Sequence, residues 1–268
     1  MIEYLRPGAS AKRARVVLFD FDGTISLIRA GWVDVMIPMM VEILREVGTD
    51  ESEEELTEIV REFVGRLTGK QTIYQTMALA EEVDKRGGKA LDPLDYKRRY
   101  LELLWEKIRH RVEALERGDA PPEDYLVPGA RRLLESFRER GLKMYLASGT
   151  DEAYMRREAD LLGVTKYFDG GVYGALDDYK SFSKAILIRR IIAGTECRGE
   201  ELLGFGDGYV EIENVKQVGG VAVGVATDEP LCLEVDAWKR QRLAAVGADF
   251  VIPNFLDHDG LLAALFGR

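Results

Sequence analysis

An apolar run that ends in two closely spaced aspartates is the feature that most constrains this chain. Residues 16–19 (VVLF) lead into Asp20, and Asp22 and Gly23 follow. A short β-branched run bounded by a glycine turn is typical of a buried strand in a parallel sheet. Open α/β sheets place their functional groups beyond the carboxyl ends of such strands. Neighbouring carboxylates repel one another, so we expect a cation or a proton to compensate their charge. An ordinary acidic turn is the alternative, because Asp and Gly both favour turns.

A second apolar run, residues 143–147 (KMYLA), ends in Ser148 and Gly149. A hydroxyl and free backbone N–H groups at a turn between a strand and a helix can hold a phosphate. The alternative interpretation makes Ser148 an ordinary capping residue for a helix that begins near Asp151.

A lysine follows at the predicted start of a helix. Apolar residues recur at helical spacing over 183–193, and Ser183 is a suitable N-cap, which places Lys184 in the first turn. The helix dipole disfavours a cation at this position unless the cation faces an anionic ligand. Lys180, earlier in the same loop, is the alternative, and a solvated surface position suits it better.

A third apolar run, residues 202–205, ends in Asp207 within Gly-Asp-Gly, and Glu211 and Glu213 follow. This segment also predicts a strand with an acidic loop at its carboxyl end. Turn formation alone is the alternative explanation for this pattern.

In this order, the segments around DFDGT, LASG, Lys184 and GDGYVE resemble the four motifs of the haloacid dehalogenase-like (HAD) hydrolases, most of which are phosphatases. The resemblance implies that Asp20 is the nucleophile and that Asp22 is the general acid and base. It also implies a set of metal and phosphate contacts: Mg²⁺ held by Asp20, Asp22 and Asp207 with Glu211 in its coordination shell, and the phosphoryl group held by Thr24, Ser148, Gly149 and Lys184. Glu211 stands where the family has an aspartate, so its longer side chain can reach the metal directly or through a water, and Glu213 is a nearby alternative.

The resemblance further implies a Mg²⁺-dependent phosphatase that hydrolyses a small phosphate monoester, such as a sugar phosphate, through an aspartyl-phosphate. A phosphomutase or phosphotransferase on the same scaffold stays open, and so does a catalytically idle HAD-fold binding module. The presence of all the polar motif residues favours an active enzyme. Asp22 argues against dehalogenation, because a halide leaving group needs no proton.

The segment between the first two motifs has helical periodicity throughout. Apolar stripes cover residues 33–47, 56–67 and 101–115, and glycine- or proline-containing breaks separate them. Strand and helix patterns alternate after this segment. We therefore expect a doubly wound, mainly parallel, Rossmann-like α/β core formed by residues 1–27 and 127–268. An all-helical cap domain at residues 28–126 would be inserted into it.

The expected cap would cover the site and supply specificity contacts. Arg29, Lys70 and Gln71 are the candidates for these contacts. For Lys70 and Gln71 the alternative is an exposed turn between two helices.

Composition agrees with a soluble enzyme that acts on a small molecule. The chain has 268 residues and a net charge of −10, which argues against a nucleic-acid surface. Cys197 and Cys232 suggest neither a disulfide scaffold nor a metal site, and we expect a cytoplasmic protein. No apolar run has the length of a membrane span, and neither His110 nor His258 suggests a Ser-His-Asp arrangement. The sequence does not define the oligomeric state.

Overall fold

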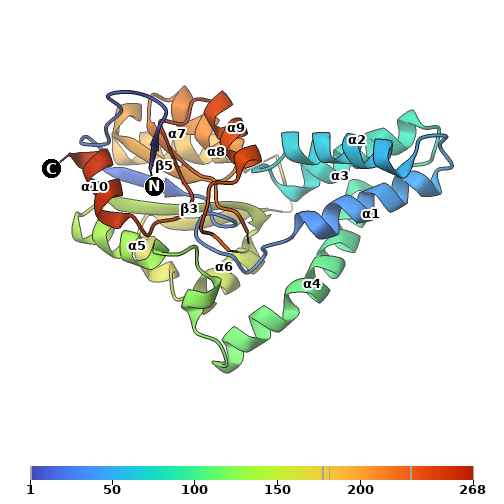
Figure 1. Cartoon of the computed structure of the whole chain (residues 1–268), viewed down its shortest axis with the longest axis horizontal. Helices are drawn as coiled ribbons and strands as arrows, with labels where there is room; N and C mark the ends of the chain where they lie inside the picture. The colour runs from blue at the N-terminus through green and yellow to red at the C-terminus, as the bar shows by residue number, and fades with distance from the viewer. Residues whose placement is uncertain (1, 177, 181, 230, 268) are drawn as a thin grey trace.

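The structure is a computed structural model that describes residues 2–176, 178–180, 182–229 and 231–267, and it has an α/β fold (Figure 1). In this part of the chain seven strands form one sheet in the order β1-β7-β6-β5-β2-β3-β4. The strands are β1 (Glu3–Tyr4), β2 (Val16–Phe19), β3 (Lys143–Asp151), β4 (Gly171–Ala175), β5 (Leu202–Gly206), β6 (Val221–Val225) and β7 (Phe250–Ile252). Only the pair of β1 and β7 is antiparallel among the described strands. This confirms the expected doubly wound, mainly parallel sheet.

Helices cover both faces of the sheet. They are α5 (Ala130–Glu139), α6 (Glu152–Leu161), α7 (Lys184–Thr195), α8 (Tyr209–Gln217), α9 (Ala237–Ala245) and α10 (His258–Phe266). In Figure 1, α7, α8 and α9 lie above the sheet, and α5 and α6 lie below it. Alternate residues of β2 join opposite cores: Val17 and Phe19 pack with α5 and α6, whereas Val16 and Leu18 pack with α7 and α8. Burial on both faces explains why β2 has no polar residue.

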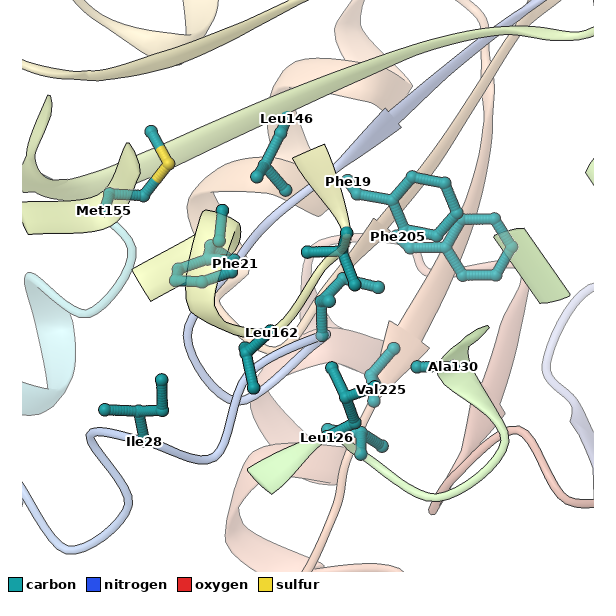
Figure 2. Close-up of a cluster of buried hydrophobic side chains, with 14 of the residues drawn as sticks. Phe19, Phe21, Ile28, Leu126, Ala130, Leu146, Met155, Leu162, Phe205 and Val225 are labelled. Carbon is teal, nitrogen blue, oxygen red and sulfur yellow. The ribbon is translucent and has the colours of Figure 1, made fainter. Parts of the chain in front are cut away.

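The core below the sheet is rich in aromatic residues, as Figure 2 shows. Phe19 stacks on Phe205 with 4.8 Å between ring centroids and an interplanar angle of 11°. Phe21, Leu146 and Met155 extend the same fully buried cluster. Aromatic packing of this kind stabilises the ends of β2 and β5 against one another. It thereby fixes where Asp20 and Asp207 emerge from the sheet.

Residues 28–126 form four α-helices beside the sheet (Figure 1). They are α1 (Val33–Glu46), α2 (Glu53–Arg66), α3 (Thr72–Lys85) and α4 (Pro93–Arg117). A capping box of Ser52 and Glu55 begins α2. Asp92 caps α4, and Gly118 ends it with a φ of 72°. Local capping signals in the sequence therefore set the boundaries of these helices.

The chain enters and leaves this helical insert at one place. Leu27 donates its backbone N–H to Tyr125 O at 2.8 Å, and Val127 donates to Ile25 O at 3.0 Å. Arg111 of α4 donates to carbonyl oxygens of the entering segment. Two paired connections at one point suit a hinge, and movement of residues 28–126 as a separate domain stays a prediction. Among the described residues, no helix combines the length and the hydrophobicity that crossing a bilayer requires.

Candidate functional site

A cavity lies at the carboxyl end of β2, between the sheet and the helical insert. β2 sits between β3 and β5 in the sheet, where a doubly wound fold opens a crevice. The space outside protein atoms is about 680 Å³, part of it open solvent. The core lines it with Asp20, Asp22, Ser148, Gly149, Thr150, Asp151, Lys184 and Asp207. The segment from residue 29 to 101 lines it with Arg29, Trp32, Met36, Thr68, Gly69, Lys70, Thr72, Gln75, Tyr100 and Leu101.

A buried ion-pair network surrounds Asp20. Lys184 Nζ lies 2.6 Å from Asp20 Oδ1 and also pairs with Glu211 Oε1. The Ser183 hydroxyl accepts a hydrogen bond from Ile186 N, so the predicted N-cap places Lys184 at the start of α7. Asp20, Lys184 and Glu211 are buried. Because two buried carboxylates pair with the ammonium, Lys184 is held in place before any ligand arrives.

Burial raises the pKa of Asp20 to about 7, although Lys184 acts in the opposite direction. The neighbouring carboxylates of Asp207 and Asp22 raise this pKa further. An additional cation would therefore stabilise the ionised form of Asp20. A metal ion at the cavity floor would relieve this repulsion between the carboxylates.

Asp22 is held by hydroxyl groups from β3. Its Oδ2 accepts from Ser148 Oγ at 3.0 Å and from Thr150 Oγ1 at 2.8 Å. Thr150 N also donates to Ser148 Oγ at 2.9 Å. Thr150 was not among the predicted site residues, although alternate residues of a strand share one face, so Ser148 was the available signal for it. Asp22 Oδ1 is buried without a hydrogen-bond partner in the described chain, and Arg29 Nε lies 4.0 Å from it.

Asp207 emerges from β5 and packs against the turn that follows β2. Gly23 in this turn has a φ of 71°, in the left-handed region that glycine adopts without strain. A Cβ at Gly23 would lie only 2.3 Å from Asp207 Oδ2. Glycine therefore satisfies two requirements at this position, since it permits the turn and also leaves room for the carboxylate.

The carboxylates of Asp20 and Asp207 supply the hard oxygen ligands that Mg²⁺ prefers, and the raised pKa of Asp20 fits such an ion. In the described residues, no three His, Cys, Asp or Glu side chains form a metal-binding group by themselves. A divalent cation would thus need backbone, water or substrate oxygens as well, which is usual for Mg²⁺. The structure places Glu211 against Lys184, and its role as a metal ligand stays a prediction.

The predicted phosphate and specificity residues lie in different environments. Ser148, Gly149, Lys184 and Lys70 line the cavity, whereas Thr24 is fully buried and is not among the lining residues. A Cβ at Gly149 would lie 2.5 Å from Lys70 O, so this glycine permits the close approach of the insert. Lys180 is exposed, as expected for a surface lysine.

Two of the specificity candidates are engaged by the protein itself. Arg29 lines the cavity but forms a bidentate ion pair with Glu158 of α6, at 2.7–3.1 Å. Gln71 is buried, and its amide donates to Tyr179 O at 2.9 Å and to Phe182 O at 2.7 Å. The interpretation of Gln71 as part of an exposed turn is therefore wrong, and the structure uses it to bind the loop before α7.

One expectation about histidine is also wrong. Ser136 Oγ lies 2.8 Å from His258 Nε2, and His258 Nδ1 lies 2.8 Å from Asp259 Oδ1, so a Ser-His-Asp chain does exist. Ser136 lies inside α5, where neighbouring backbone amides bond within the helix and none is free to hold an oxyanion. Asp259 is largely exposed. These hydrogen bonds therefore join α5 to α10 and do not form a catalytic site.

Comparison with solved structures finds the same fold in other proteins. A phosphonoacetaldehyde hydrolase-like protein from Oleispira antarctica matches with a TM-score of 0.62 and 14% identity, covering 96% of this chain and 94% of its own. A predicted phosphoglycolate phosphatase from Haemophilus somnus matches with a TM-score of 0.59 and 13% identity, covering 93% and 98%. A β-phosphoglucomutase from Clostridium difficile matches with a TM-score of 0.54 and 17% identity, covering 85% and 92%.

No curated protein matches the sequence. The family model of the haloacid dehalogenase-like hydrolases matches residues 14–219, which include β2, the helical insert, β3, α7 and β5. The match thus contains all the core residues that line the cavity. The chain belongs to the haloacid dehalogenase-like hydrolases and is an enzyme of this family.

Proposed function

We propose that this enzyme is a Mg²⁺-dependent phosphatase that hydrolyses a small phosphate monoester through an aspartyl-phosphate. The observation that carries the proposal is the environment of Asp20, whose carboxylate lines the cavity 2.6 Å from the Lys184 ammonium. Asp22 and Asp207 line the same cavity. A nucleophile, a proton donor and a fixed cation at one site are what phosphoryl transfer to a carboxylate requires. The similar solved structures include one described as a predicted phosphatase, which agrees with the proposal.

In the first step, a carboxylate oxygen of Asp20 attacks phosphorus, and the bond from phosphorus to the alcohol oxygen breaks. Asp22, when protonated, gives its proton to the departing oxygen. In the second step, Asp22 takes a proton from water, and the resulting hydroxide attacks the aspartyl-phosphate to release inorganic phosphate. The hydroxyl groups of Ser148 and Thr150 hold Asp22 in one orientation for both transfers.

Lys184 and Ser148 would contact the equatorial oxygens of the phosphoryl group. Glu211 would help Asp20 keep the Lys184 ammonium in position. Mg²⁺, held by Asp20, Asp207 and the Asp22 backbone carbonyl, would neutralise charge on the transferring group. HAD phosphatases generally use a divalent cation, and the all-oxygen donor set supports Mg²⁺ here.

The insert supplies a mixed wall for the alcohol part of the substrate. Trp32, Met36 and Leu101 contribute apolar surface, and Lys70 and Gln75 contribute polar groups. Such a wall suits a small phosphorylated metabolite, which we expect the enzyme to meet in the cytoplasm. Phosphomutase activity is the alternative, and it would return phosphate to the substrate instead of releasing it.

Removal of divalent cations tests the proposal. Phosphate release from p-nitrophenyl phosphate and from a panel of sugar phosphates should cease in EDTA and return with excess Mg²⁺. The reason is that no metal ion would then neutralise charge on the transferring phosphoryl group. Undiminished turnover in EDTA would refute the metal assignment. Substrate isomerisation without phosphate release would instead favour a phosphomutase.

Lys184 and Lys180 offer a matched pair of variants. Lys184→Ala should lower kcat/KM by roughly a hundredfold or more, because it removes a preorganised contact to the phosphoryl group. Lys180→Ala should lower it less than about twofold, because this lysine is exposed on the surface. Thermal melting of both variants separates loss of activity from loss of fold. The opposite ranking would assign the phosphate contact to Lys180.

A further inference from the structure

A lysine from outside the four motif segments reaches Asp207. Lys239 of α9 places its Nζ 3.2 Å from Asp207 Oδ2 and 2.9 Å from Glu229 Oε1. The three side chains are only 12–18% exposed. Asp236 caps α9 by accepting a hydrogen bond from Lys239 N at 2.7 Å, so the start of this helix fixes the lysine backbone.

These three groups meet at the same turn as the motif aspartates. A Cβ at Gly23 would lie 2.3 Å from Asp207 Oδ2 and 3.3 Å from Glu229 Oε1, so both carboxylates flank this glycine. The ammonium of Lys239 thus pairs with both Asp207 and Glu229 at this turn. A divalent cation bound to Asp207 would have to share this carboxylate with it.

We propose that Lys239 is an internal cation that occupies Asp207 when no metal is bound and lowers the affinity of the site for divalent cations. Glu229 opposes this effect, because it offers the ammonium a second carboxylate and so leaves Asp207 freer for the metal. The inference rests on the proposed function, in which Asp207 is a metal ligand. It adds a means of setting metal affinity that none of the motif residues provides.

Coulomb's law gives opposite signs for changes to the two residues. Lys239→Met removes a positive charge next to the metal site, so Mg²⁺ should bind at least about fivefold more tightly. Glu229→Gln removes the competing carboxylate and leaves the ammonium to Asp207 alone, so Mg²⁺ should bind at least about threefold more weakly. Lys239→Arg keeps the charge, so its Mg²⁺ affinity should stay within about twofold of the wild type. If Lys239 served only to support the fold, Lys239→Met and Glu229→Gln would not shift the Mg²⁺ affinity in opposite directions.

Isothermal titration of Mg²⁺ into the full-length wild type and the three variants measures these affinities directly, without substrate. Thermal melting in EDTA gives a second readout. Lys239→Met should melt at a lower temperature than the wild type, because Asp207 and Glu229 then repel one another, and Mg²⁺ should raise its melting temperature by more. If the wild type binds Mg²⁺ and Lys239→Met binds it equally or more weakly, the inference is refuted. If the wild type binds no Mg²⁺, the metal site of the proposed function is refuted, and the inference fails with it.

Discussion

Replacing Asp20 with asparagine is expected to lower kcat for p-nitrophenyl phosphate by about 10⁴-fold or more, because an amide cannot form the covalent intermediate. The change nearly conserves shape and removes a buried charge, so the fold should persist. The Asp20→Asn variant should also not become phosphorylated, which intact mass measurement after acid quenching would show. Lys184 and Glu211 would remain as a pair, so the surroundings of the substituted residue should stay in place.

Asp22→Asn is the matched control for this experiment, because it keeps the nucleophile and removes only the proton-transfer group. p-Nitrophenol is a good leaving group that needs little protonation, so this variant should still form the aspartyl-phosphate and then hydrolyse it slowly. Phosphorylated protein should therefore accumulate in Asp22→Asn and be absent in Asp20→Asn. Near-wild-type kcat in Asp20→Asn would contradict the assignment of the nucleophile.

The parts of this molecule that sequence could predict are those that local pattern determines. β2 and β5 are apolar on both faces, so their carboxyl ends, and with them Asp20 and Asp207, follow from the residue order. The choice of Lys184 over Lys180 rested on its resemblance to the family's lysine at the head of a helix, and the structure contains the predicted Ser183 N-cap of this helix. Hydrophobic periodicity likewise predicted the helical nature of the insert.

Elements that depend on a distant partner were missed. β1 has two residues and exists through its pairing with β7, and β4 is a short glycine-containing strand at the far edge of the sheet. α5 and α10 were not predicted, although both are amphipathic or apolar segments that cover one face. Short segments carry too few periods for a pattern to distinguish strand, helix and loop.

Contacts between distant residues account for most of what remained hidden in the site. Gln71 bonds to Phe182, 111 positions away, and Arg29 pairs with Glu158, 129 positions away. Lys239 lies beyond all four motifs. A charged residue gives the same sequence signal whether it faces solvent or a buried partner. Only the fold decides between these cases, and here it shows that Arg29 and Gln71 both have partners within the protein.

Arg29→Met is expected to destabilise the protein by about 3–5 kcal/mol, because it leaves Glu158 buried without its partner. Arg29 and Glu158 are only 7% and 4% exposed, and the pair joins the entry to the helical insert with α6 of the core. Burial already raises the pKa of Glu158 against the lowering effect of Arg29, so the carboxylate would tend to protonate once the arginine is removed. Urea unfolding followed by circular dichroism measures the loss.

Two further variants show whether the effect belongs to this ion pair. Arg29→Met combined with Glu158→Leu should recover much of the stability, because no unpaired charge is then buried. Arg66→Met breaks an ion pair with Glu62 in which both side chains are at least 60% exposed, and it should cost less than about 1 kcal/mol. A similar small loss for Arg29→Met would mean that Glu158 finds water or another partner when the arginine is absent. In that case the joint between insert and core would depend on apolar packing and on the paired connections of residues 25–27 and 125–127, and not on this salt bridge.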